Sequence, residues 1–162
     1  MKYLIVGLEN SATKVVAKIF ATNLNIEGSD KYDGHKSLSD DLNLVQHFSF
    51  PYGENRPKRD RNYHPEVNEA DWDHIIIVTR DFNCSLKSKL KAHQPNKELA
   101  LKEHEEGKKN LKKIIKFKNS KVFSYESWAI LRDDYVEKFL SEYSISYDNK
   151  QKVKDINKKH LK

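Results

Sequence analysis

The sequence predicts a single α/β domain in which helices cover both faces of a central, mainly parallel β-sheet. Short apolar segments rich in β-formers alternate along the chain with segments of helical periodicity. The first such pair is joined by a turn of about six residues, the length of an ordinary βα connection. With 162 residues, the chain has the size of one domain. Such sheets bind ligands at the carboxyl ends of their strands.

The first half of the chain supplies one strand and one helix of this pattern. Residues 2–6 form an apolar run suited to a strand buried on both faces. From Thr13 onward, apolar residues recur at helical spacing as far as Leu24. Residues 28–41 are polar and predict a loop, and residues 43–53 contain a short apolar segment. Residues 54–66 are basic and irregular, which is typical of a functional or disordered loop.

The second half supplies two more strands and three helices. Residues 73–81 contain the clearest strand, and residues 82–93 predict a helix. Residues 96–117 predict an exposed helix with many ion pairs, whose core stripe consists of Leu111, Ile114 and Ile115. Further elements are a third strand at 121–126, an amphipathic helix at 132–145 and a basic helix or tail from about residue 148.

Composition narrows the function only coarsely. The chain has 30 Lys and Arg residues against 24 Asp and Glu residues, a net charge of +6. This charge favours anionic partners without choosing between nucleotides, sulfated sugars, nucleic acids and membranes. The single cysteine, Cys84, excludes an internal disulfide. Neither a signal peptide nor an apolar run long enough to span a membrane is evident, so we expect a cytoplasmic protein. The histidines lack metal-site spacing, and no metal is expected.

The turn after the first strand has the features of a phosphate-binding loop. A helix N-terminus presents free backbone N–H groups and the positive end of the helix dipole. Ser11 and Thr13 add hydroxyl groups, and Lys14 adds a positive charge. The P-loop pattern of NTPases requires Gly-Lys-[Ser/Thr] where this chain has Ala12, Thr13 and Lys14. A plain turn in which Ser11 or Thr13 caps the helix is the alternative.

A second group of candidate residues follows the strand at 73–81. Arg80 stands directly after the apolar run, and Ser88 follows eight residues later. An arginine can bind a phosphate with two parallel hydrogen bonds, and a serine hydroxyl can add a third. The alternative is a surface ion pair between Arg80 and Asp81 or Glu126.

Taken together, these motifs resemble those of the sulfotransferase family. Gly7-x-x-x-Ser11-x-Thr13 is similar to the family's loop for 3′-phosphoadenosine-5′-phosphosulfate. The segment "IIIVTRDFNCSLKSKL" is similar to its second motif, and "VFSYESW" is similar to a later strand motif. The three motifs occur in the family's order, from residue 1 to about residue 143. The resemblance implies a three-layer, P-loop NTPase-like fold.

The resemblance also implies roles for individual residues. The donor would lie between the first loop and the Arg80–Ser88 pair, with Arg80 and Ser88 on its 3′-phosphate. An acceptor hydroxyl, with a carbohydrate as the candidate, would lie near the segment around His47, the candidate catalytic base. The first loop contributes Gly7, Glu9, Asn10, Ser11, Ala12, Thr13 and Lys14, and the acceptor side contributes His47, Ser49, Tyr52 and Arg56.

The chain departs from the family pattern at three positions. Ala12 stands where the loop has a glycine, Asn10 where it has a lysine or arginine, and Phe82 where the second motif has a proline. Lys14 is therefore the candidate for the positive charge that assists the leaving group. Two other readings stay open: a nucleotide kinase-like or other NTP-binding P-loop protein, and a nucleotide-binding module without catalysis. Nucleic-acid binding is disfavoured because aromatic and basic residues do not interleave.

Overall fold

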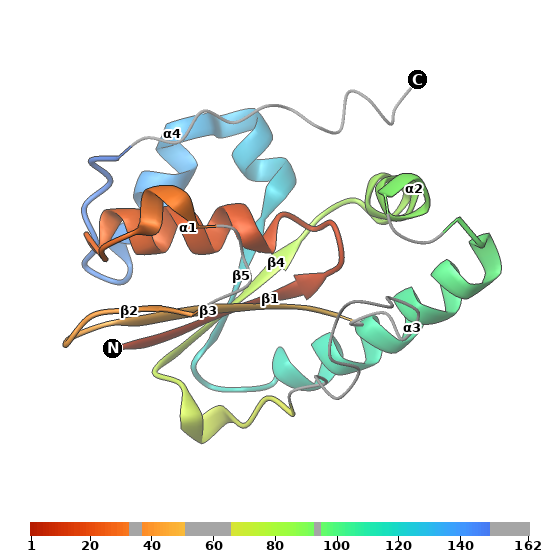
Figure 1. Cartoon of the computed structure of the whole chain (residues 1–162), viewed down its shortest axis with the longest axis horizontal. Coiled ribbons are helices and arrows are strands. Elements are labelled where there is room, and N and C mark those ends of the chain that lie inside the picture. Colours follow the sequence, from red (N-terminus) through yellow and green to blue (C-terminus); the bar gives the residue numbers. More distant parts are fainter. Residues whose placement is uncertain (33–36, 51–65, 93–94, 150–162) are drawn as a thin grey trace.

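The computed structural model describes residues 1–32, 37–50, 66–92 and 95–149, and these residues form an α/β fold. Five strands of the described residues build one sheet in the order β2-β3-β1-β4-β5 (Figure 1). Strands β3, β1, β4 and β5 run parallel, and β2 pairs antiparallel with β3 at the edge. The predicted mainly parallel sheet is confirmed. The strands are β1 (Lys2–Leu8), β2 (Leu38–Ser39), β3 (Leu44–Phe50), β4 (His74–Thr79) and β5 (Ser120–Ser124).

Helices lie on both faces of the sheet. Helices α1 and α4 cover one face, and α3 runs across the other, with α2 at the end where the parallel strands terminate (Figure 1). The α-helices are α1 (Thr13–Asn23), α2 (Phe82–Ala92), α3 (Lys97–Ile114) and α4 (Tyr125–Ser141), and the short 3₁₀ helices are η1 (Ser29–Lys31) and η2 (Glu69–Asp71). None of the helices in the described part of the chain combines the length and apolar character that crossing a bilayer requires.

Strand β1 lies at the centre of the molecule and contributes to two separate cores. Tyr3 and Ile5 pack with side chains of α1 and α4 on one face. Leu4 and Val6 pack with Ile114 of α3 on the other. All four side chains of β1 are fully buried, as expected of a central parallel strand whose side chains alternate between two covered faces.

Strand β3 is not predicted by the hydrophobic pattern of the sequence. It pairs with β1 along its whole length, from Lys2 opposite Leu44 to Leu8 opposite Phe50. Its sequence, LVQHFSF, places polar residues between the apolar ones, so it lacks the continuous apolar run of a buried parallel strand. The polar positions His47 and Ser49 lie on the face that carries α1, since they are paired in register with Ile5 and Gly7.

The side chains that helix α3 buries differ from those that the sequence predicts. Ile114 is buried as predicted, but Ile115 is 54% exposed. The buried face also includes Glu103, His104 and Gly107. A Cβ atom at Gly107 would lie 2.6 Å from Leu8 and 3.1 Å from the Phe50 backbone. The helix therefore rests closely on the ends of β1 and β3, and its polar side chains are enclosed there.

Helix α4 begins earlier than the sequence predicts. It starts at Tyr125, directly after β5, and Ser124 caps it by accepting a hydrogen bond from the Ser127 N–H. Its regular geometry is interrupted at Arg132, where φ is 55° and ψ is −130°. The predicted third strand therefore ends two residues early, and the VFSYESW segment forms a strand-to-helix junction.

Candidate functional site

The candidate site lies where two neighbouring strands send the chain to opposite faces of the sheet. Strand β1 continues into α1, which covers one face, and β4 continues through α2 into α3, which covers the other (Figure 1). Strands β1 and β4 are paired side by side and run parallel. The connections therefore diverge at their carboxyl ends, which is the position where open α/β sheets bind ligands.

The loop between β1 and α1 makes a tight turn over the end of β1. Asn10 and Ala12 both adopt left-handed backbone conformations, with φ of 66° and 78°. The Ser11 N–H donates to the Leu8 carbonyl at 3.0 Å and closes the turn. A Cβ atom at Gly7 would lie 2.3 Å from the Ser11 Oγ. Glycine at this position therefore allows the loop to fold back on its own strand.

The N-terminus of α1 is open to an anion. Ala12 occupies the N-cap position, and no side chain caps the helix, so the alternative of a plain Ser11 or Thr13 cap does not apply. Within the described residues, the N–H groups of Ala12, Thr13 and Lys14 donate no hydrogen bond. Free N–H groups at a helix N-terminus, beside the positive end of the helix dipole, favour a negatively charged ligand.

Ser11 adds an unsatisfied polar group to this loop. Its side chain is 1% exposed, and its Oγ has no hydrogen-bond partner among the described residues. The Asn10 Nδ2 is likewise buried without a partner there. Buried polar atoms in folded proteins usually have a protein or water partner, so both groups are available to an ordered water or a ligand.

Arg80 connects the loop with the two later motifs. Its Nη1 donates a 2.7 Å hydrogen bond to the Asn10 carbonyl. Its guanidinium carbon lies 5.0 Å from the centroid of the Tyr125 ring. Arg80 follows β4 directly, and Tyr125 is the first residue of α4. The three segments that the sequence singles out therefore meet around one guanidinium group, whose stacking on an aromatic ring restricts its orientation.

The start of α2 is fixed by acidic side chains beside Arg80. The Asp81 Oδ1 accepts a 2.8 Å hydrogen bond from the Cys84 N–H, and the Glu126 Oε1 accepts a 2.7 Å hydrogen bond from the Asp81 N–H. The bond from Cys84 is the main cause that holds the pKa of Asp81 below its usual value. Cys84 itself is buried, and burial raises the pKa of its thiol, which disfavours a nucleophilic role.

The serine of α2 that touches the loop is Ser85, one turn before the predicted Ser88. The Ser85 Oγ donates to the Glu9 carbonyl at 2.8 Å and is fully buried. Ser88 is half-buried, and its side chain makes no hydrogen bond within the described part of the chain. Ser85 therefore supports the loop from below, whereas Ser88 retains a hydroxyl that can bind a ligand.

A buried charged cluster lies beneath the loop. Lys89 of α2 is 0% exposed, and its Nζ lies 3.2 Å from the Glu9 Oε2 and 2.5 Å from the Glu103 Oε2. His104 of α3 is also fully buried, with its Nε2 3.3 Å from the Ser85 Oγ. Burial, and then the positive charges of Lys89 and Lys108, lower the pKa of His104 to about 4. His104 is therefore neutral at physiological pH.

Apart from Glu9, the residues of this cluster are not among the candidates that the sequence suggests. Its one sequence signal lies in α3, where Ala100, Glu103, His104 and Gly107 recur at three- and four-residue intervals. That spacing marks one helix face, and the glycine on it marks a close approach to another element.

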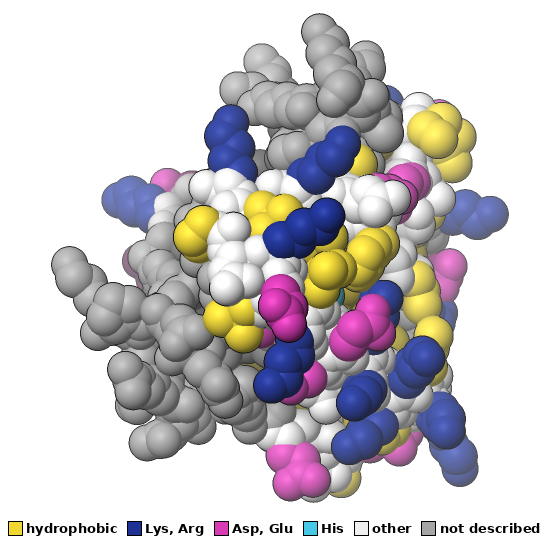
Figure 2. Space-filling view, turned by 90° about the vertical axis from the view of Figure 1, so that its right-hand side faces the viewer, with side chains coloured by type: hydrophobic (Ala, Val, Ile, Leu, Met, Phe, Trp, Pro, Cys, Tyr) yellow, Lys and Arg dark blue, Asp and Glu magenta, His cyan; other side chains and the backbone are white. Residues whose placement is uncertain are grey.

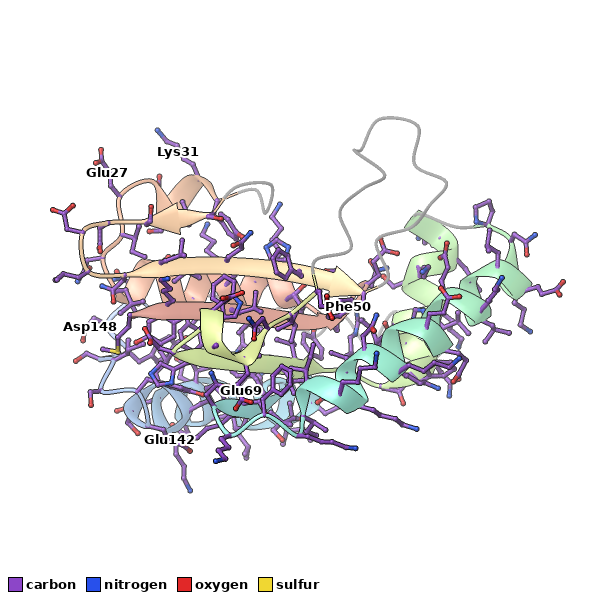
Figure 3. The ribbon with its side chains drawn as sticks, turned by 90° about the horizontal axis from the view of Figure 1, so that it is seen from below. Glu27, Lys31, Phe50, Glu69, Glu142 and Asp148 are labelled. Atoms are coloured by element: carbon purple, nitrogen blue, oxygen red, sulfur yellow. The ribbon has the colours of Figure 1, made fainter. Side chains whose placement is uncertain are left out.

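Strand β3 carries the candidate acceptor residues along one face. The Ser49 Oγ lies 2.9 Å from the Thr13 Oγ1, at the first residue of α1. His47 lies two residues before Ser49 in β3. Its Nδ1 lies 2.5 Å from the Tyr32 hydroxyl oxygen. Figure 3 shows Phe50 at the end of β3 that points toward α2 and α3. Tyr52 and Arg56 lie outside the described residues.

The surface around this end of the molecule carries mixed charge. Lys14 is exposed in the first turn of α1. Figure 2 looks onto the side with α2 and α3, where Lys and Arg side chains are interspersed with acidic and hydrophobic ones instead of forming an unbroken basic patch. In the residues that the structure describes, no three side chains of His, Cys, Asp or Glu are arranged to hold a metal ion.

Comparison with known proteins does not suggest a function, so a functional assignment depends on the geometry of the site. No protein-family model, curated protein or solved structure matches this chain.

Proposed function

We propose that this chain is a sulfotransferase-like protein that binds 3′-phosphoadenosine-5′-phosphosulfate at the β1–α1 loop and has a three-layer, P-loop NTPase-like fold. The observation that carries the proposal is the loop itself. Its free N–H groups and the unsatisfied Ser11 hydroxyl lie beside Arg80, where β1 and β4 diverge. Hydrogen-bond donors concentrated at a helix N-terminus favour a phosphate or sulfate group.

The motif resemblance assigns the donor's two ends to two sides of the site. The loop of residues 9–14 takes the 5′-phosphosulfate, and Arg80 and Ser88 take the 3′-phosphate. Lys14 supplies positive charge to the 5′-phosphate as it leaves. Transfer of a sulfuryl group depends mainly on positioning and charge stabilisation, which fixed backbone donors and cations provide.

His47 is the proposed base on the acceptor side. The acceptor oxygen forms a bond to sulfur, the bond between sulfur and the 5′-phosphate oxygen breaks, and His47 takes the hydroxyl proton. The products are the sulfated acceptor and 3′-phosphoadenosine-5′-phosphate. The contact between His47 and Tyr32 fixes the orientation of the imidazole, and the ordinary pKa of histidine suits proton transfer near neutral pH.

Isothermal titration calorimetry with 3′-phosphoadenosine-5′-phosphate tests this proposal. We expect wild-type protein to bind, and Arg80→Ala to weaken binding by about 10- to 100-fold, because a charge-assisted hydrogen bond contributes about 1.5–3 kcal/mol. Lys113→Ala is the matched control. It removes the same charge from an exposed position near the end of α3 and is expected to leave binding unchanged.

Three outcomes would argue against this proposal. Absence of binding at millimolar ligand, or equal binding by wild type and Arg80→Ala, removes the donor assignment. Magnesium-dependent binding of ATP without binding of the adenosine bisphosphate favours an NTP-binding protein instead. Donor-product binding without turnover on a panel of hydroxyl acceptors favours a non-catalytic module.

A further inference from the structure

Glu9 presents a contradiction within the proposed phosphate site. A carboxylate in an anion-binding loop repels the ligand and weakens binding. In the structure, the Glu9 carboxylate contacts the ammonium group of Lys89 in the interior of the protein. Glu9 is 7% exposed, so its charge is enclosed beneath the loop.

We propose that Lys89 is a positioning residue that pairs with the Glu9 carboxylate and thereby holds the β1–α1 loop in its phosphate-binding conformation. This inference rests on the proposed function, since it concerns the same loop. Lys89 is fully buried and bonded to carboxylates on both sides, from the loop and from α3. It acts on the ligand site through Glu9, from the interior of the protein.

The contacts of Glu9 show how the constraint reaches the loop. Its N–H donates to the Phe50 carbonyl at 2.9 Å, and its carbonyl accepts from the Ser85 Oγ at 2.8 Å. With the ion pair to Lys89, the residue is held through its N–H, its carbonyl and its side chain. The next residue, Asn10, is in the left-handed conformation and is held by Arg80. Such conformations persist only where the surroundings enforce them.

The energetic cost of burying Lys89 supports a role beyond stability. Removing charges from water costs several kcal/mol per ion, and apolar side chains of similar volume often give a more stable protein. A fully buried lysine is also rare. Within the cluster, the contact with Glu9 ties the loop to α2, whereas the contact with Glu103 ties α2 to α3.

The first experiment compares Lys89→Met with wild type by calorimetry, using 3′-phosphoadenosine-5′-phosphate as the probe. The substitution removes the ammonium group that faces the Glu9 and Glu103 carboxylates, so Glu9 moves toward water and repels the ligand. We expect affinity to fall about tenfold, equivalent to about 1.4 kcal/mol. Lys89→Arg, which keeps the charge, is expected to restore most of the affinity.

A matched pair of substitutions distinguishes a positioning role of Lys89 from a contribution to the overall stability of the fold. Glu9→Gln and Glu103→Gln each remove one carboxylate charge from Lys89, but only Glu9 belongs to the loop. If Lys89 acts through Glu9, the double variant Lys89→Met/Glu9→Gln binds no more weakly than Lys89→Met alone. Glu103→Gln lowers the melting temperature but keeps affinity within about twofold of wild type.

Hydrogen exchange at the Glu9 and Ser11 amides, which donate to the Phe50 and Leu8 carbonyls, is measured by NMR and provides a readout that needs no ligand. We expect faster exchange there in Lys89→Met than in wild type. Val136→Ala, which destabilises the core of α1 and α4, is the control. The amides of that core should exchange no faster in Lys89→Met than in wild type or in this control. If Lys89→Met lowers the melting temperature but leaves loop exchange and affinity unchanged, the positioning role is wrong. If wild type does not bind the probe, the proposed function fails, and the exchange comparison alone decides the role of Lys89.

Discussion

At the residue scale, Ala12 adopts a backbone conformation that glycine takes easily and alanine rarely takes. Its φ of 78° and ψ of 18° lie in the left-handed region, which costs an L-residue about 1–2 kcal/mol and costs glycine almost nothing. The loop therefore keeps a glycine-type turn with an alanine in it. The methyl group packs against the core of α1 and α4.

Ala12→Gly is accordingly expected to raise the free energy of unfolding by about 0.5–1 kcal/mol. Relief of the left-handed strain exceeds the added entropy of the unfolded chain, which is about 0.4–1 kcal/mol. Urea denaturation measures this change. Ala21→Gly, in the regular part of α1, is the control and should destabilise by about 1 kcal/mol or more. Destabilisation of similar size at both positions would contradict the prediction.

Residue chemistry also explains which parts of the site the sequence revealed. Gly7 lies near the end of a strand, and Ser11 and Arg80 follow strands. The rule that parallel strands end at one edge is enough to predict that these residues meet. Lys89 was not predictable in this way, because lysine is almost always exposed and its two partners are distant in sequence. Only the folded arrangement of α2 against α3 makes it a buried residue.

At the element scale, α3 is held by its close approach to the ends of β1 and β3. Gly107 makes this approach possible, because a Cβ atom there would lie 3.1 Å from the carbon and oxygen of the Phe50 carbonyl group. The Phe50 carbonyl also accepts the hydrogen bond from Glu9. The spacing between α3 and the sheet is therefore coupled to the position of the loop.

Gly107→Ala is expected to destabilise the protein by about 1 kcal/mol, although alanine is the better helix former. The gain in helix propensity is about 1 kcal/mol, and overpacking against a backbone that cannot move costs about 1–3 kcal/mol. Guanidinium denaturation followed by circular dichroism checks the sign. A more stable variant would mean that α3 can shift outward without loss.

The elements that hydrophobic periodicity predicted have uninterrupted apolar patterns, and those that it missed or misplaced do not. The strand β4 and the helix α1 have uninterrupted apolar patterns, and the structure contains both. Strand β3 carries His47 and Ser49 on the α1 face, so it departs from the pattern of a buried strand. The junction from β5 to α4 was misplaced because Tyr125 and Trp128 suit a strand as well as a buried helix.

At the scale of the whole molecule, His104 makes the stability dependent on pH. Its pKa in the folded protein is about 4, against about 6.5 in the unfolded chain. Between these values the unfolded state binds more protons, so stability is full above about pH 6.5 and falls as the pH is lowered toward 4. A difference of about 2.5 pKa units corresponds to about 3 kcal/mol.

Urea denaturation between pH 7.5 and pH 4.5 tests this dependence by comparing wild type with His104→Gln. The glutamine amide can replace the imidazole as a neutral donor to Ser85, and it does not titrate. We expect wild type to lose more stability on acidification than the variant does. Acidic groups and His74, whose pKa burial also lowers, contribute equally to both proteins and cancel. Parallel curves would show that His104 takes up a proton as readily in the folded protein as in the unfolded chain.

The left-handed Ala12 has a consequence for how such loops are recognised among other sequences. A pattern that requires glycine at the turn passes over this chain, although the backbone adopts the turn that glycine usually marks. The residues that lead into this turn are held from outside the loop, at the Asn10 carbonyl by Arg80 and at the Glu9 carbonyl by Ser85. A search for proteins of this kind should therefore pair the loop with an arginine after the adjacent strand and a serine in the following helix, leaving the turn residue itself unspecified.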